Sequence, residues 1–209
     1  MSEMKLYHIH RSNENNKIWQ PNNKIIMKED SQTGLYKQYM NFNQGVLYQT
    51  NTGTQRVLLS ELLRAKMSLL QYHAFINQRD MMEILQLLNG AANLSDQADI
   101  FKREQALELY RQNYVPHLPS RLHSIYLCDK EGRDYWYDIL EGDSKYIFEV
   151  KATGNIFKTN EQFLPDEILS YEDTYKQAKK YWEPTIGSDM NMTNEYLVQG
   201  EIEVLRRVK

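Results

Sequence analysis

The stretch NEYLVQGEIEVLR, residues Asn194–Arg206, decides the fold because it has the length and the alternation of a long β-strand. Apolar or small residues occupy every second position from Tyr196 to Val204, and strand side chains alternate between the two faces of a sheet. The segment KYIFEVK, Lys145–Lys151, alternates in the same way. MKLYHIH, Met4–His10, is predicted as a strand near the other end of the sequence.

The first strand divides its side chains between two faces. One face carries Leu6, His8 and His10, and the other carries Tyr7 and Ile9. Two further short strands are predicted after it, at Ile18–Pro21 and Lys24–Met27, on either side of an Asn22–Asn23 turn. Residues 29–55 are polar and show no strong period, so a loop with one or two weak elements is predicted there.

The middle of the chain, from Arg56 to Tyr114, shows the three- and four-residue spacing of apolar residues that is typical of helices. The pair Asn89–Gly90 favours a helix end, and Ser95 favours the start of another helix. Separate helices are therefore predicted on either side. No linker rich in Gly and Ser flanks them, so a single domain is predicted over residues 1–209, with a helical segment at 56–114.

Shorter elements follow in the second half. A strand is predicted at Leu122–Leu127, a short helix at Asp134–Leu140 and a longer helix at Asp166–Trp182. Pro165 precedes this last helix and suits a first helical turn. Strands near both ends with helices between them predict the α+β class rather than a regular βαβ alternation.

The composition excludes several classes of protein. Apolar residues make up 41% of the 209 residues and the net charge is only −3, which argues against a disordered chain or a general nucleic-acid scaffold. Cys128 is the only cysteine, so an intrachain disulfide and a Cys-rich zinc site are excluded. No run of 18 apolar residues occurs, so no transmembrane helix, no membrane partner and a cytoplasmic location are expected.

Three segments carry recognisable motifs. They are Leu6–His10 (LYHIH), Ser124–Asp129 (SIYLCD) with Tyr137 eleven positions after Tyr126, and Asn194–Val198 (NEYLV). Together, in this order, they resemble the ADP-ribosyltransferase superfamily in its His-Tyr-Glu branch, which includes the poly(ADP-ribose) polymerases and diphtheria-type toxins. The motifs of that branch read Leu-Trp-His-Gly-Ser, Gly-Ile-Tyr-Phe-Ala-Asp and Asn-Glu-Tyr-Ile-Val. Some uncharacterised bacterial proteins with a Pro-Ser-Arg before the second motif share this layout, as Pro119–Ser120–Arg121 does here.

The resemblance implies a fold and an activity. The implied fold is a split antiparallel sheet around an NAD cleft, with the segment 56–114 as a helical insertion. The implied activity is that of an NAD-dependent ADP-ribosyltransferase or NAD glycohydrolase. Such an enzyme cleaves the nicotinamide–ribose bond of NAD and transfers ADP-ribose to an acceptor. The acceptor stays open among a protein, a nucleic acid, a small molecule and water.

The resemblance also implies roles for single residues. Glu195, His8 and Tyr126 are the expected catalytic residues, and the expected NAD contacts are His8, Ile9, His10, Tyr126 and Tyr137. A carboxylate such as Glu195 stabilises the positive charge that develops on the ribose. Tyr126 and Tyr137 are expected to hold the flat nicotinamide ring by stacking. His8 is expected to bind a ribose hydroxyl, and the backbone of Ile9 to hold the nicotinamide amide.

Two departures from the motif leave a second function open. Ile9 replaces a glycine that lets the backbone approach the ligand closely, and His10 replaces a small hydroxyl residue. The alternative is a non-catalytic nucleotide-binding or interaction module that keeps the ADP-ribosyltransferase fold. A third reading, the RNA 2′-phosphotransferase branch, is disfavoured by the intact Tyr-Tyr-Glu set.

Two other pairs of residues resemble functional patterns, but both have simpler interpretations. His8 and His10 share a strand face, but a third metal ligand is not evident, so no metal site is predicted. The pair Glu201 and Glu203 resembles the Glu-x-Glu of the Arg-Ser-Glu branch of the superfamily. The middle strand lacks the Ser-Thr-Ser of that branch, so the pair is interpreted as a solvated strand face.

Overall fold

The structure is a computed structural model, and it describes residues 4–11, 17–41, 45–50, 53–72, 78–142, 144–185 and 192–209. The chain divides into two compact units. Unit 1 consists of Met1–Gln38 and Arg103–Lys209, and unit 2 consists of Tyr39–Lys102. Helix α3 (Gln78–Tyr114) supplies residues to both units. The single domain over 1–209 stays a prediction.

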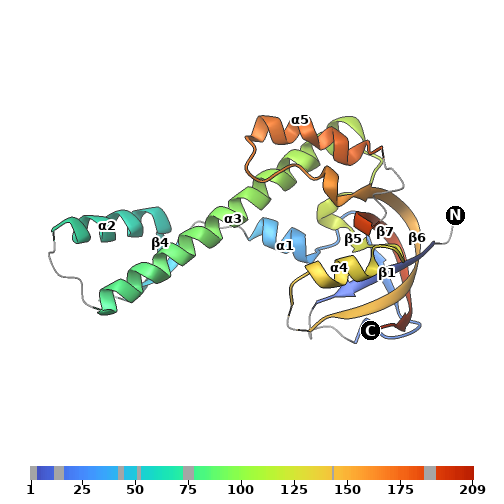
Figure 1. Cartoon of the computed structure of the whole chain (residues 1–209), viewed down its shortest axis with the longest axis horizontal. Helices are drawn as coiled ribbons and strands as arrows, with labels where there is room; N and C mark the ends of the chain where they lie inside the picture. Colours follow the sequence, from blue (N-terminus) through green and yellow to red (C-terminus); the bar gives the residue numbers. More distant parts are fainter. Residues whose placement is uncertain are drawn as a thin grey trace. The chain divides into compact units, whose positions relative to one another are not determined.

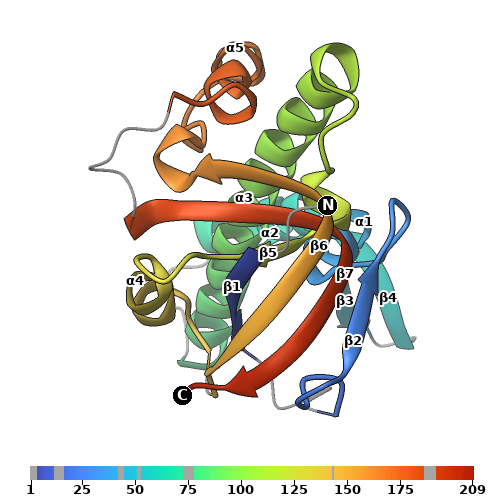
Figure 2. The same ribbon diagram turned by 90° about the vertical axis from the view of Figure 1, so that its right-hand side faces the viewer.

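Unit 1 is built on a five-stranded antiparallel sheet. Its strands are β1 (Met4–His10), β2 (Lys24–Met27), β5 (Ile125–Leu127), β6 (Tyr146–Asn160) and β7 (Asn194–Arg207). The order is β1-β6-β7-β2, and β5 also pairs with β7. The two longest strands, β6 and β7, lie side by side (Figure 2). This sheet and its helices confirm the predicted α+β class, whereas the finer ADP-ribosyltransferase fold stays a prediction.

A short backbone bridge closes part of this sheet on itself. Tyr7 N donates to Cys128 O at 2.8 Å, and Cys128 N donates to Tyr7 O at 2.9 Å. Strands β1, β6, β7 and β5 therefore form a ring of hydrogen-bonded neighbours. The face inside the ring, called the inner face, carries the largest apolar cluster. Its buried members are Leu6, Trp19, Leu127, Phe148, Val150, Ala152, Tyr196, Val198, Ile202 and Val204.

Helices cover the opposite, outer face. The C-terminal part of α3 and the helix α5 (Tyr171–Trp182) pack on β7 through a second cluster, and the two helices lie beside each other (Figure 1). Its buried members are Leu107, Tyr110, Ala178, Tyr181, Trp182 and Leu197. The helix α4 (Arg133–Ile139) packs on a third cluster, formed by Ile9, Cys128 and Ile147. The predicted short helix at Asp134–Leu140 is thus confirmed.

Unit 2 contains a hairpin and two helical segments. The hairpin pairs β3 (Gly45–Thr50) with β4 (Gly53–Leu58), and α2 (Leu59–Tyr72) follows directly. Lys66 of α2 and Glu83 of α3 form an ion pair at 2.8 Å, which joins the two helices. Residues 29–55 were predicted as a loop with one or two weak elements, and the described residues there form α1 (Gly34–Met40), β3 and the start of β4.

The predicted break in the middle helices is wrong, because α3 runs without interruption through Asn89–Gly90 and Ser95. A glycine inside a helix costs only about 1 kcal/mol relative to alanine, and Ala91 and Ala92 favour the helix on its C-terminal side. The absent side chain of Gly90 also leaves room for buried Leu59, whose Cδ2 lies 3.8 Å from the position of a Cβ there.

Three other boundaries differ from the prediction. Helix α5 begins at Tyr171 rather than Asp166, because the side chain of Ser170 accepts a hydrogen bond from Asp173 N and caps the helix there. The predicted strand at Ile18–Pro21 forms turns instead. The strand predicted at Leu122–Leu127 begins only at Ile125, after a short 3₁₀ helix η1 (Arg121–His123).

A pair of glycines lies at the centre of the long β6–β7 ladder. Gly154 and Gly200 are direct partners, with φ of 128° and 150°. A Cβ on Gly200 would lie 2.1 Å from Thr153 O and 2.9 Å from Gly154 Cα. Both the backbone conformation and the close approach of the two strands therefore require glycine.

We expect Gly200→Ala to lower the free energy of unfolding by roughly 2–3 kcal/mol, because the new Cβ meets main-chain atoms and the φ of 150° is strained for alanine. Gly34→Ala is the matched control, since nothing lies within 4 Å of its Cβ position. Urea denaturation of the two variants measures the difference. Equal stability of both variants would contradict the close approach of β6 and β7.

Candidate functional site

Glu195 lies on the outer face near the start of β7, where a buried ion cluster surrounds it. Its exposed fraction is 5%. Arg121 Nη1 donates to Glu195 Oε1 at 3.0 Å, and the hydroxyl of Tyr181 donates to the same oxygen. Arg121 also donates through Nε and Nη2 to both carboxylate oxygens of Glu104, at 2.8 and 3.2 Å. The Glu195 carboxylate is therefore held by hydrogen bonds and closed off from solvent.

The groups of this cluster fix one another's protonation states. Burial alone would lower the pKa of Arg121, but the carboxylates of Glu104 and Glu195 raise it well above its ordinary value. Burial also raises the pKa of Tyr181 well above the ordinary value. Arg121 thus stays charged and Tyr181 stays protonated as a hydrogen-bond donor. A buried guanidinium with two carboxylates is strongly destabilised when one partner is removed.

Tyr126 belongs to the same region of the outer face. The Arg121 guanidinium carbon lies 5.2 Å from the centre of the Tyr126 ring. The Tyr126 hydroxyl donates to Arg121 O at 3.1 Å. Burial raises the pKa of Tyr126 well above its ordinary value, so the hydroxyl stays protonated. Two of the predicted site residues, Tyr126 and Glu195, are therefore brought together by Arg121.

His8 lies on the other face of the sheet. Its ring stacks on Trp19 with centroids 4.1 Å apart and planes 9° apart, and its Nδ1 lies 3.1 Å from Tyr126 O. Burial lowers the pKa of His8 to about 3, although the hydrogen bond to the Tyr126 carbonyl opposes this shift. At neutral pH the ring is uncharged. Because a carbonyl can only accept, Nδ1 carries the hydrogen and donates it.

The remaining predicted site residues, His10, Ile9 and Tyr137, are also divided between the two faces of the sheet. His10 lies on the inner face, with its ring centroid 5.5 Å from that of Trp19. Ile9 points outward and packs with Ile147 and Cys128. Tyr137 is on α4 and packs against the same outer cluster as Ile9.

The roles implied for His8, Tyr126, Tyr137 and Glu195 predict that these residues meet in one cleft, and this prediction is wrong. His8 pairs in register with Phe148 of β6, and Phe148 lies on the inner face, whereas Glu195 pairs with Thr159 on the outer face. The pairing with β7 shifts register once, between Glu149 and Val150, but Phe148, Val150 and Ala152 all stay in the inner cluster. From Val150 to Asn160 no further shift occurs, so residues of opposite parity lie on opposite faces. The NAD-contact and catalytic roles of the individual residues stay predictions.

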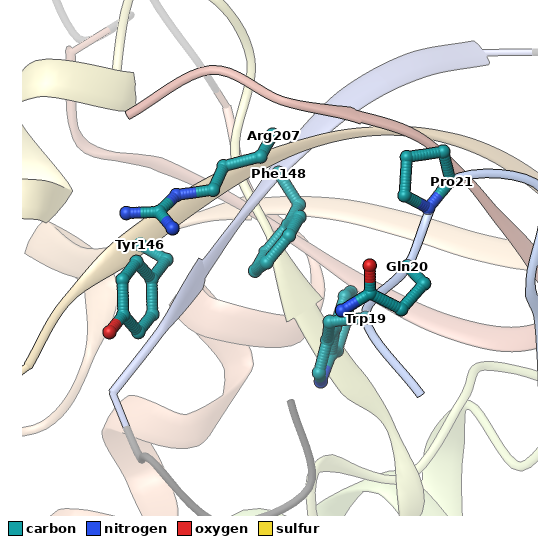
Figure 3. A pocket seen from close by; sticks show the side chains of 6 residues that line it. All are labelled: Trp19, Gln20, Pro21, Tyr146, Phe148 and Arg207. Atoms are coloured by element: carbon teal, nitrogen blue, oxygen red, sulfur yellow. The ribbon is translucent and has the colours of Figure 1, made fainter. Parts of the chain in front are cut away.

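A pocket opens at the end of the inner face (Figure 3). Its volume is about 240 Å³, and its lining residues are Trp19, Gln20, Pro21, Tyr146, Phe148 and Arg207. The guanidinium carbon of Arg207 lies 4.0 Å from the centre of the Tyr146 ring. The rings of Trp19 and Phe148 stack with centroids 5.4 Å apart. His10 adjoins the pocket, because its ring also lies near Phe148, at 6.3 Å.

Sequence reasoning missed most of these groups. Trp19 was assigned only to a predicted strand, and Arg207 follows directly after the strand predicted at Asn194–Arg206. Arg121 was noted only as part of the Pro119–Ser120–Arg121 motif. Glu104 and Tyr181 carried no signal, because their partners lie far away in the sequence. No three His, Cys, Asp or Glu side chains are grouped to hold a metal ion in the described ranges. Among the helices of those ranges, none has the length and apolarity needed to cross a membrane.

The pKa of His8 gives a prediction about pH. The pKa of His8 is about 3 in the folded chain and about 6.5 in the unfolded chain. Between pH 6.5 and pH 3 the ring is therefore protonated only when the chain unfolds. Protonation then favours the unfolded state, so the free energy of unfolding falls as the pH falls. From pH 7 to pH 5, His8 should lower the free energy of unfolding by up to about 2 kcal/mol. His8→Gln should lose less stability than the wild type over this range in urea titrations.

The control for this experiment is His117→Gln, which removes an exposed histidine. It removes one histidine side chain, as His8→Gln does, but leaves the contacts of His8 in place. If His8→Gln shows the same loss of stability as the wild type between pH 7 and pH 5, then His8 is not held neutral in the folded chain.

Comparison with known proteins gives the family. A family model described as "Protein of unknown function (DUF2441)" matches residues 6–209. A search of curated proteins found no match. The family description names no activity, so it leaves the resemblance to ADP-ribosyltransferases as a prediction. Because the match covers far more than half of the sequence, the chain belongs to the DUF2441 family.

Proposed function

We propose that this chain is a nucleotide-binding protein whose pocket at the end of the inner face takes one aromatic ring of the ligand. The observation that carries the proposal is the pocket lining, which combines Trp19, Tyr146 and Phe148 with the guanidinium of Arg207. Aromatic rings stack on a flat heterocycle, and a guanidinium binds an anionic oxygen through charged hydrogen bonds.

The charge of the lining supports an anionic ligand. Arg207 is the charged residue among the six that line the pocket, and no carboxylate is among them. Its Nε donates to the backbone oxygen of Lys209 at 3.0 Å, which leaves the other guanidinium nitrogens over Tyr146. A neutral or cationic aromatic ligand would gain less from this arrangement than a nucleotide does.

The volume limits which part of the ligand is enclosed. At about 240 Å³, the pocket is smaller than the roughly 300–1,000 Å³ that encloses a drug-sized ligand. One heterocyclic ring, such as a nucleobase or nicotinamide, is the part that suits this space. The ribose and phosphates of a nucleotide would then lie outside, along the end of the sheet.

NAD and ADP-ribose are the first ligands to test. Strand β1 carries the His-Ile-His segment whose resemblance implies NAD contacts, and its last residue, His10, adjoins the pocket. This is the binding-module alternative of the two functions that the sequence left open. It requires neither Glu195 nor Tyr126 to reach the ligand.

We expect Arg207→Gln to weaken the binding of NAD or ADP-ribose by about tenfold or more, because a hydrogen bond to a charged group is lost. Arg206→Gln is the matched control. It removes the same charge from the neighbouring residue, but Arg206 binds Glu149 on the outer face, with Nε to Oε2 at 2.7 Å. Calorimetric titration measures both affinities. A wild type that binds neither ligand, or two variants that bind equally well, would contradict the proposal.

Catalysis on NAD is the second candidate, and the contacts of Arg121 with Tyr126 and Glu195 favour it. These are the tyrosine and the glutamate that the resemblance makes catalytic. The carboxylate is preorganised by two donors, which is what stabilisation of a developing positive charge requires. Its exposed fraction of 5% means that NAD reaches it only after the surrounding side chains move.

If the chain releases nicotinamide from NAD, Glu195→Gln should lower kcat by about 10²–10³, with little change in NAD affinity, because the positive charge develops only in the transition state. Glu104→Gln is the control, since Arg121 also binds this buried carboxylate. Thermal denaturation should show similar stability losses in both variants, whereas only Glu195→Gln should lose turnover. Equal turnover in the two variants would remove Glu195 from the reaction.

A further inference from the structure

The pocket at the end of the inner face has two chemically different ends. Figure 3 shows the guanidinium of Arg207 and the ring of Tyr146 at one end. It shows Gln20 and Pro21 at the other end, with Phe148 between the two. One end of the pocket therefore carries a positive charge, and the other carries an uncharged carboxamide.

The backbone of Gln20 belongs to a turn that is fastened to the sheet. The backbone oxygen of Gln20 accepts a hydrogen bond from Asn23 N at 3.1 Å, and Asn22 N donates to Val204 O of β7 at 2.7 Å. Trp19, which precedes Gln20, is buried in the inner cluster. The chain is thus anchored on both sides of Gln20, and its side chain reaches the pocket from a fixed backbone.

A carboxamide in this position can pair with the edge of a flat ring, because it presents a donor nitrogen beside an acceptor oxygen. Adenine presents the complementary pair, the N6 amino donor beside the N7 acceptor, and glutamine binds this pair with two hydrogen bonds. Figure 3 shows the amide of Gln20 at the end of its side chain that faces Phe148. A ring seated against Phe148 would meet this amide with its edge.

The charge of Arg207 distinguishes between the two rings of NAD. The carboxamide of nicotinamide could also pair with Gln20, but the nicotinamide ring of NAD is positively charged at the nitrogen that joins it to ribose. With the far edge of the ring on Gln20, this nitrogen would face the end of the pocket that holds Arg207, where like charges repel. Adenine is neutral, and its ribose and 5′-phosphate leave toward the guanidinium, which attracts them.

We propose that the pocket takes the adenine end of the nucleotide and that Gln20 recognises the edge of the adenine ring. This inference rests on the proposed function, and it names the ligand class as adenine nucleotides. The nicotinamide end of NAD then lies outside the pocket. Ligands that share the adenine end, such as NAD, NADH and ADP-ribose, should therefore bind alike.

A double-mutant cycle tests the role of Gln20. Calorimetric titration compares AMP with purine riboside monophosphate, which lacks the 6-amino group, in the wild type and in Gln20→Met. The wild type should bind AMP about fivefold to tenfold more tightly than the analogue, because the analogue cannot donate to the amide. Gln20→Met should bind the two ligands with equal affinity, because methionine keeps the length of the side chain and removes the amide.

The matched control is Gln112→Met. Gln112 is an exposed glutamine of α3 whose Nε2 donates to Glu108 Oε1 at 3.1 Å, and it does not line the pocket. This variant should keep the preference of the wild type for AMP. Thermal denaturation of both variants shows that they are folded. A Gln20→Met variant that keeps the preference for AMP would overturn the inference while nucleotide binding stands.

A second titration shows which end of NAD the pocket encloses. NAD and NADH should bind to the wild type equally well, and AMP should bind about tenfold more tightly than nicotinamide mononucleotide, which has one phosphate but a charged ring. If NADH binds more tightly than NAD, the pocket encloses the nicotinamide end, and the inference fails although the proposed function stands. If the wild type binds none of AMP, NAD and ADP-ribose, both proposals fail.

Discussion

The ladder between β6 and β7 determines where every candidate group of unit 1 lies. From Val150 to Asn160 the pairing with β7 continues without a register shift. Since strand side chains alternate, this one ladder divides the sheet into an apolar inner face and an outer face that meets the helices. The aromatic pocket belongs to the first face and the ion cluster around Arg121 to the second. Two chemically different sites thus share a backbone but not a surface.

The buried charges of the outer face hold the helices on the sheet. Arg121 contacts Glu104 of α3, Tyr181 of α5 and Glu195 of β7. Taking such charges out of water is expensive, and the cost is offset only when each hydrogen-bonding group finds a partner. The arrangement therefore favours one relative placement of these elements within unit 1. It gives Glu195 a structural role, whether or not it also has a catalytic one.

How much was predictable depends on the range of the interactions. The alternation in Asn194–Arg206 shows that Glu195 and Tyr196 point to opposite faces, and the pattern of Met4–His10 does the same for His8 and Ile9. Whether His8 of β1 lies on the same face of the sheet as Glu195 or as Tyr196 of β7 depends on the register of the strands. Both strands pair with β6, and the sequence of a single strand does not show the register of these pairings.

The helices show the converse problem. Gly90 and Ser95 are good local signals for a helix boundary, but packing against Leu59 and the surrounding helix-forming residues outweighed them. Arg121 stands in a short motif that the sequence made visible. Its partners Glu104 and Tyr181 could not be predicted, because a contact between two distant segments produces no periodic pattern in the sequence of either segment.

The glycine pair of β6 and β7 limits how this sequence can evolve. A large side chain in a core usually becomes tolerable when a neighbouring side chain shrinks. At Gly154 and Gly200 the atoms in the way are Gln199 O, Thr153 O and the two Cα atoms, which every amino acid carries. No second substitution can make room for a side chain at either position. We therefore expect both glycines to be retained while the residues around them are substituted.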